Sequence, residues 1–256
     1  MALYESRVGD ILAHQELRNI EAIFLDDGGV INDNSLRVPQ WQRLFGEFMV
    51  SRFGGEAVAW GEANLQFVIE EGKLMHDGKF FPPGVEPDQV LRQRDDRFTS
   101  EIFASVGIEP PDSSEERVAL AREFHNYGIS RVRADYPGAV AAVRELHAMG
   151  YALYMASGGK SVDLRMQLTA SGVVELFTET YGPDIAGIPK GGRAFYDSIL
   201  AHSGVDPAAA LFLDDTPNSI RRISAVSARG VLVSTSEEES TAVARLSSLA
   251  ELPGLL

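Results

Sequence analysis

Residues 22–31 read Ala-Ile-Phe-Leu-Asp-Asp-Gly-Gly-Val-Ile, so four apolar residues run into an acidic, glycine-rich turn. Such a run is typical of a buried strand in a parallel sheet. Open α/β sheets bind ligands at the carboxyl ends of their strands, so Asp26 is the first candidate for chemistry. Gly28 and Gly29 allow the backbone to turn sharply and to approach a ligand closely. Taken alone, the Asp-Gly pair is equally typical of a plain β-turn.

Strands and helices alternate along the chain after residue 136. We expect strands at 151–156, 210–213 and 230–234, a segment at 175–181 that crosses back to the sheet, helices at 139–149, 161–171, 194–202 and 219–227, and a short final helix. This alternation predicts an α/β fold with a Rossmann-like, doubly wound parallel sheet. Residues 1–20 are expected to add a short amphipathic helix.

A section of different character interrupts this pattern. Trp41, Phe45 and Phe48 recur at helical spacing, and strand-like alternation is absent up to residue 135. Glycine pairs and prolines separate the expected helices, two of which are predicted at 89–106 and 114–127, with Ser114 as an N-cap. We therefore predict two domains. These are a core made of residues 1–34 and 136–256, and an inserted α-helical cap made of residues 35–135.

Composition excludes several classes of protein. The chain has 256 residues, 45% of them apolar, and a formal net charge of -14. The negative field disfavours nucleic acid and anionic membranes as partners. The absence of cysteine excludes disulfides, thiolate metal sites and cysteine nucleophiles. No apolar run approaches the length of a membrane span, and no signal-peptide core is present, so we expect a cytoplasmic protein.

Polar residues end three of the expected strands. Asp26 follows the first, Ser157 the second and the pair Asp214-Asp215 the third, while Lys190 lies in a glycine-rich segment between them. Considered alone, Ser157 is typical of a helix cap and the Asp214-Asp215 pair is typical of a capping turn. Lys190 alone would be expected on the protein surface. Together at one sheet edge, carboxylates would repel one another unless a hard divalent cation such as Mg²⁺ lay between them. A cation, a hydroxyl and a lysine can neutralise a phosphoryl group, so a small phosphorylated, anionic substrate is expected.

These motifs resemble those of the haloacid dehalogenase-like hydrolase superfamily. The matching positions are the strand 22–25 with Asp26 to Gly29, the acid at Asp33, the strand ending in Ser157 after Tyr136-Pro-Gly138, Lys190, and Asp214-Asp215. The resemblance covers residues 22 to about 235. It implies that the helical insertion is a mobile cap that closes over the site and sets specificity.

The resemblance also implies roles for the site residues. Asp26 would be the nucleophile and would form an aspartyl-phosphate, with Ser157 and Lys190 as the other catalytic residues. Mg²⁺ would be held by Asp26, the carbonyl of Gly28, Asp214 and Asp215. The substrate-binding set would be Asp27, Gly28, Gly29, Ser157, Gly158 and Lys190.

One departure from the family pattern concerns the chemistry directly. Gly28 stands where the family has the aspartate that serves as general acid and base. Such catalysis contributes roughly 10²- to 10⁴-fold, so a phosphatase without it should be slow on alkyl phosphates and suffer least with leaving groups of low pKa. Asp27 is an imperfect substitute because neighbouring strand residues point to opposite faces. His76 in the cap is a second conceivable donor.

We therefore predict a Mg²⁺-dependent hydrolase, most simply a small-molecule phosphatase acting through Asp26. Three alternatives stay open. Carbon–halogen hydrolysis needs neither the missing acid nor Mg²⁺, and the retained pair Asp214-Asp215 argues against it. Phosphonate hydrolysis needs a cap lysine, for which Lys73 and Lys79 are the candidates. A weakly active or non-catalytic protein that binds a phosphorylated ligand would also account for the loss of the acid.

Overall fold

The computed structural model describes residues 17, 19–76, 82, 84–235 and 244–256. The helix expected within residues 1–20 lies almost wholly outside this part of the chain, as do Lys79 and the side chain of His76. The chain divides into two compact units, one made of residues 1–34 and 134–256 and the other of residues 35–133. We describe them separately as the core and the cap.

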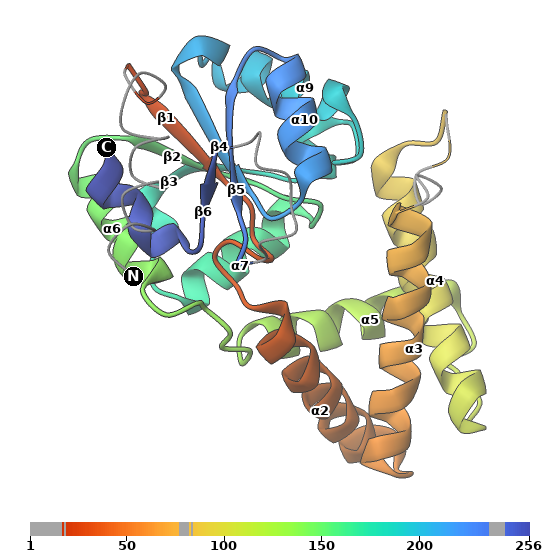
Figure 1. Ribbon diagram of the computed structural model, residues 1–256. Coiled ribbons are helices and arrows are strands. Elements are labelled where there is room, and N and C mark those ends of the chain that lie inside the picture. Colours follow the sequence, from red (N-terminus) through yellow and green to blue (C-terminus); the bar gives the residue numbers. More distant parts are fainter. Residues whose placement is uncertain (1–16, 18, 77–81, 83, 236–243) are drawn as a thin grey trace. The chain divides into compact units, whose positions relative to one another are not determined.

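The core is built on a six-stranded parallel sheet (Figure 1). Its strands are β1 (Ala22–Leu25), β2 (Ala152–Ala156), β3 (Phe177–Tyr181), β4 (Ala210–Asp214), β5 (Arg229–Val233) and β6 (Arg245–Leu246). Their spatial order is β3-β2-β1-β4-β5-β6, so β1 lies in the middle and the chain winds outward in both directions. The predicted doubly wound α/β sheet is confirmed. The two-residue strand β6 was not expected from the sequence.

Helices cover both faces of the sheet. They are α6 (Ala139–Ala148), α7 (Ser161–Ala170), α8 (Pro183–Ala186), α9 (Arg193–Ser203) and α10 (Pro217–Ala225), with 3₁₀ turns η1 (Val174–Leu176), η2 (Pro207–Ala209) and η3 (Leu249–Leu255). Figure 1 shows α6 and α7 on one side of the sheet and α9 and α10 on the other. The helix expected at 219–227 begins two residues earlier, because Pro217 occupies the first turn after the N-cap Thr216.

The alternation of side chains along β1 creates the two halves of this hydrophobic core. Ile23 and Leu25 pack with residues of α6 and α7, whereas Ala22 and Phe24 pack with residues of α9 and α10. Phe24 stacks between Tyr154 and Phe212, with ring centroids 4.6 and 4.4 Å apart. Because every residue of β1 is buried on both faces, the strand reads as a continuous apolar run and holds the turn that follows it firmly in place.

The cap contains four helices in its described part, α2 (Asn34–Phe53), α3 (Ala57–His76), α4 (Pro87–Val106) and α5 (Ser114–Ile129). Aromatic rings fill its centre, and Phe45 touches Trp60, Phe98 and Phe124 edge-on. The N-cap of α5 is Ser113 and not Ser114 as predicted. Ser113 forms a capping box with Glu116, which satisfies a backbone donor at each of the two positions.

A charged residue, Glu71, is buried in the cap beside these rings. Glu71 accepts from Arg94 Nε at 2.7 Å and from Arg97 Nη2 at 2.6 Å, and Arg94 also lies over the ring of Phe67. Arg94 thereby joins α4 to the buried Glu71 of α3. The arginines bridge helices, and this role accounts for their charge without any ligand.

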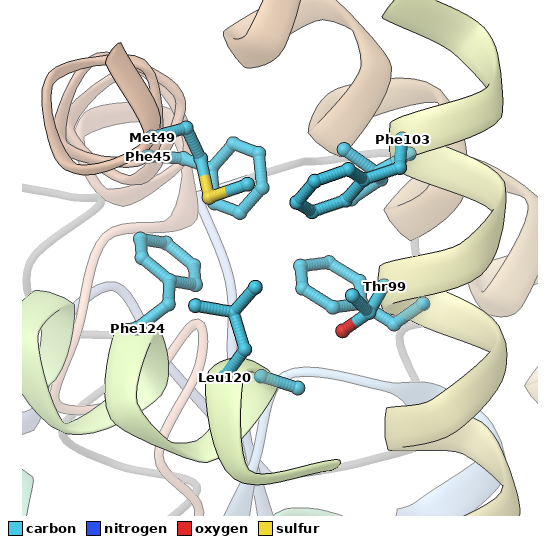
Figure 2. Close-up of a pocket in the computed structure, with 9 residues that line it drawn as sticks. Phe45, Met49, Thr99, Phe103, Leu120 and Phe124 are labelled. Carbon is cyan, nitrogen blue, oxygen red and sulfur yellow. The ribbon is translucent and has the colours of Figure 1, made fainter. Parts of the chain in front are cut away.

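Figure 2 shows the cavity that the cap helices enclose. It measures about 10 Å³, which is room for at most one water molecule. Its lining is apolar except for Thr99, whose hydroxyl donates to the carbonyl of Arg117 at 2.8 Å. The cavity is therefore a gap in aromatic packing, and it is too small for a substrate.

Candidate active site

Two carboxylates lie level with each other at the carboxyl ends of β1 and β4. Leu25 is paired with Leu213 in the parallel ladder, so Asp26 and Asp214 follow at the same height. The Asp26 N–H donates to the Leu213 carbonyl at 3.0 Å, which extends the ladder to the first residue of the turn. Neighbouring strands are about 4.8 Å apart, so the two side chains are neighbours.

Lys190 joins these two carboxylates. Its ammonium nitrogen Nζ lies 2.8 Å from Asp26 Oδ2 and 2.8 Å from Asp214 Oδ2, and only 9% of its side chain is exposed. The segment that carries it follows β3 through α8, so the topology returns the lysine to the sheet edge. The sequence predicted this meeting of Asp26, Asp214 and Lys190, and the structure brings all three together.

The other oxygens of the two aspartates accept hydrogen bonds from their own turns. Asp26 Oδ1 accepts from the Asp27 N–H at 2.8 Å. Asp214 Oδ1 accepts from both the N–H and the hydroxyl of Thr216, at 2.9 and 2.8 Å. Every oxygen of Asp214 therefore has a donor, and this side chain is only 3% exposed.

Burial and the neighbouring charges set the protonation of this cluster. Burial raises the pKa of Asp26 to about 7, with Lys190 opposing and the Asp214 and Asp215 carboxylates adding to the rise. Burial also works against ionisation of Asp214, but Lys190 and Thr216 outweigh it and keep the pKa of Asp214 below its usual value. Burial alone would lower the pKa of Lys190, and the Asp26 and Asp214 carboxylates reverse this so that its pKa is raised and it stays charged.

Asp215 completes a group of three acids. One carboxylate oxygen from each of Asp26, Asp214 and Asp215 can be chosen so that all lie within 4.8 Å of one another. Asp215 is half-buried and its carboxylate lies against Gly29, whose φ of +79° places the first turn close to it. A Cβ at position 29 would overlap the Asp215 carboxylate, so only glycine permits this close approach.

Asp27 points to a different set of partners. Asn32 Nδ2 donates to Asp27 Oδ1 at 2.6 Å. With its amide nitrogen facing Asp27, Gln167 donates to both carboxylate oxygens at 3.1 Å. Asp27 is 6% exposed, and its carbonyl also accepts from the N–H groups of Ile31 and Asn32. It shapes the turn, and no sequence pattern indicated its partner Gln167, which lies 140 residues further along the chain.

Ser157 lies at the same sheet edge as Asp26. β2 runs beside β1 with Met155 level with Leu25, and the Ser157 N–H donates to the Tyr181 carbonyl at 3.0 Å. Gly158 follows in the turn before α7, which brings both predicted phosphate-binding positions to this edge. Asp33 donates its N–H to the Ala134 carbonyl at 2.7 Å, where the chain returns to the core.

Sequence reasoning also missed Asp184, which helps to organise this edge. Asp184 of α8 accepts from the Ser161 N–H at 2.9 Å and from the Ser161 hydroxyl. It thereby links the turn that carries Ser157 to the segment that carries Lys190. Asp184 lies at the start of α8, directly after Gly182 and Pro183, yet its carboxylate accepts from Ser161 of another helix, α7. The sequence could not have indicated this pairing.

A model of the haloacid dehalogenase-like hydrolase family matches residues 20–225. The chain belongs to this family. A comparison with curated protein sequences found no significant match. None of the described helices has the length and apolar character needed to cross a membrane.

Solved structures share the hydrolase fold at low sequence identity. L-2-haloacid dehalogenase from Xanthobacter autotrophicus, with chloropropionic acid covalently bound, is 16% identical with a TM-score of 0.60, over 92% of this chain and 98% of that chain. The haloacid dehalogenase-like hydrolase YfnB from Bacillus subtilis, bound to magnesium, is 14% identical with a TM-score of 0.66, over 93% and 99%. 2-Haloacid dehalogenase from Pseudomonas syringae is 14% identical with a TM-score of 0.62, over 92% and 97%. At this identity the likeness concerns the fold.

Proposed function

We propose that this hydrolase transfers a phosphoryl group to Asp26 and then hydrolyses the resulting aspartyl-phosphate, with Mg²⁺ as its cofactor. The observation that carries the proposal is the position of Asp26, one oxygen of which is held by Lys190 while a second acid, Asp214, anchors the lysine from the other side. A carboxylate placed at the end of a central strand is fixed in direction, which favours attack on an electrophile.

The acidic cluster fits a hard divalent cation. Asp26, Asp214 and Asp215 bring three carboxylates within reach of one another, and when all three are ionised the single ammonium of Lys190 leaves two negative charges uncompensated. Oxygen donors in this arrangement suit Mg²⁺. When bound, the ion would neutralise the phosphoryl oxygens and offset repulsion between the substrate and Asp26.

The contacts of Asp214 and Asp215 differ, so we assign the two acids different roles. Asp214 gives one oxygen to Thr216 and the other to Lys190, so its main role would be to hold the lysine. Asp215, which lies against the turn of Gly29, would be the more direct ligand beside Asp26 and the carbonyl of Gly28. Ser157 and the backbone of Gly158 would contact the phosphoryl oxygens together with Lys190.

A second candidate is carbon–halogen hydrolysis, which is favoured by the same Asp26 and by the glycine at position 28. Displacement of halide requires a carboxylate nucleophile and no proton donor. The reaction would proceed without Mg²⁺, whereas the surplus of negative charge around Asp26 favours the metal-dependent phosphatase. Phosphonate hydrolysis would need a cap lysine, and Lys73 lies exposed on α3.

The test is phosphate release from p-nitrophenyl phosphate and acetyl phosphate, with Mg²⁺ or with a chelator. We expect turnover that requires Mg²⁺ and is lost in Asp26→Asn. Asp197→Asn is the matched control, because Asp197 forms an exposed ion pair with Arg193 on α9 and should retain activity. Chloride release from L-2-chloropropionate that is indifferent to Mg²⁺ would favour the dehalogenase instead. Binding of phosphate compounds without turnover would favour a binding protein.

A further inference from the structure

The groups around Asp26 in the described core determine how a leaving group can be protonated there. Phosphoryl transfer to Asp26 breaks the bond between phosphorus and the leaving oxygen, and that oxygen must depart either protonated or as an anion. Position 28, two residues beyond the nucleophile, has no side chain because it is glycine. The question is whether another residue of the core supplies the proton.

The Asp27 carboxylate is already hydrogen-bonded to other side chains. Its two carboxylate oxygens accept hydrogen bonds from the side-chain amides of Asn32 and Gln167, so the group is held as an acceptor. Gln167 belongs to α7 and fixes the direction in which Asp27 points. A carboxylate in this position cannot turn to a substrate on Asp26 without breaking these bonds.

The two other carboxylates of the acidic cluster also have partners. Asp214 accepts from Thr216 and Lys190, and Asp215 packs on Gly29 in the acidic cluster. The ammonium of Lys190 is shared between Asp26 and Asp214. Tyr196 on α9 is only 1% exposed.

We propose that this core cleaves phosphoryl compounds whose leaving group departs as a stable anion, such as aryl phosphates and acyl phosphates, and that the phosphorylated enzyme accumulates during turnover. The proposal rests on the phosphatase function proposed above. Accumulation follows because the carboxylate missing at position 28 would also have taken the proton from the attacking water in the second step.

The two steps balance without a protein acid. In the first, an oxygen of Asp26 forms a bond to phosphorus, the bond to the leaving oxygen breaks, and the electron pair leaves with an aryloxide or carboxylate anion. In the second, a water oxygen attacks phosphorus, the bond from phosphorus to Asp26 breaks, and Asp26 becomes a carboxylate again. The two water protons stay on the released dihydrogen phosphate or pass to solvent. The first step is fast with a stable anion, and the second is slow for every substrate.

The experiment uses the full chain with Mg²⁺ and a series of substituted phenyl phosphates, from dinitrophenyl to unsubstituted phenyl. Rapid-quench measurements record the phenol released before the steady state. Gly28→Asp restores a carboxylate, and Gly28→Asn is the control of similar size that cannot donate a carboxyl proton. Gly28 is not among the glycines with a positive φ, so a side chain adds no left-handed strain at this position.

We expect kcat/KM to fall steadily as the leaving group becomes more basic, kcat to stay constant for the reactive substrates, and one equivalent of phenol to appear in a burst. Gly28→Asp should raise kcat/KM for phenyl phosphate by roughly 100-fold or more and shorten the burst, and Gly28→Asn should not. A flat dependence of kcat/KM in the native protein would overturn the inference while leaving the phosphatase intact. If no member of the series, dinitrophenyl phosphate included, is turned over, the proposed function itself fails.

Discussion

The backbone of Gly29 lies directly against the carboxylate of Asp215, so closely that a Cβ at position 29 would overlap it. This contact joins the turn after β1 to the turn after β4, the two segments that carry the acidic cluster. Gly29 has a φ of +79°, which lies in the left-handed region, where a residue with a side chain is disfavoured.

Gly29→Ala should therefore do two things. The left-handed backbone should cost about 1–2 kcal/mol of stability, and displacement of Asp215 should weaken Mg²⁺ binding. Denaturant unfolding and Mg²⁺-titrated activity measure the two effects. Gly54→Ala is the control, because Gly54 has a φ of +72° and open space around its added Cβ. If Gly29→Ala and Gly54→Ala both needed the same Mg²⁺ concentration for activity as the native protein, the assignment of Asp215 as a metal ligand would be wrong.

Asp27→Asn separates a structural carboxylate from a catalytic one. An amide at position 27 offers one acceptor oxygen where two are used by Asn32 and Gln167, so we expect a loss of about 1–3 kcal/mol in the free energy of unfolding. The dependence of kcat/KM on the leaving group should keep its slope. A selective loss on basic leaving groups would show instead that Asp27 donates the proton.

Asp184→Ala tests the link between the Ser157 turn and the Lys190 segment. Removal of the carboxylate leaves the buried N–H and hydroxyl of Ser161 without their acceptor, and should destabilise the protein by about 1–3 kcal/mol. We expect kcat/KM to fall as well, because both phosphate-binding segments lose a common support. Asp197→Ala, which breaks only an exposed ion pair, should change stability by less than about 1 kcal/mol. Equal effects of the two variants would contradict this role for Asp184.

Tyr196 gives the fold a dependence on alkaline pH. Burial raises the pKa of Tyr196 to about 12, with Lys190 opposing and Asp214 adding to the rise, whereas tyrosine in an unfolded chain ionises near pH 10. Between these values the unfolded state loses a proton that the folded state keeps, so the free energy of unfolding should fall as pH rises. Denaturation at pH 9 and pH 11 should show a smaller fall in Tyr196→Phe. An unchanged pH dependence would argue that Tyr196 ionises normally in the folded protein.

Local patterns were enough to predict the sheet and the residues at its edge. Asp26, Ser157 and Asp214 each end an apolar run, and the carboxyl ends of parallel strands meet at one edge, so their proximity followed from the strands alone. Lys190 carries no such signal. Its place among the acids depends on a segment whose path is set by tertiary packing, and only the spacing of the family motifs indicated it.

Other features depend on partners that are distant in the sequence. Glu71 faces the cap interior because Arg94 and Arg97 neutralise it, and these partners lie 23 and 26 residues further along the chain. Ser113, and not the adjacent Ser114, is the N-cap because Glu116 completes the capping box three residues later. That signal was present in the sequence.

The most direct test of the account is to locate the transferred phosphoryl group. The protein is mixed with Mg²⁺ and dinitrophenyl phosphate, quenched, and reduced with borohydride, which converts an aspartyl-phosphate to homoserine that peptide mass spectrometry can place. We predict conversion at residue 26 alone, dependent on Mg²⁺ and absent from Asp26→Asn. Conversion at another residue, or turnover with no modified residue, would contradict a mechanism that passes through Asp26.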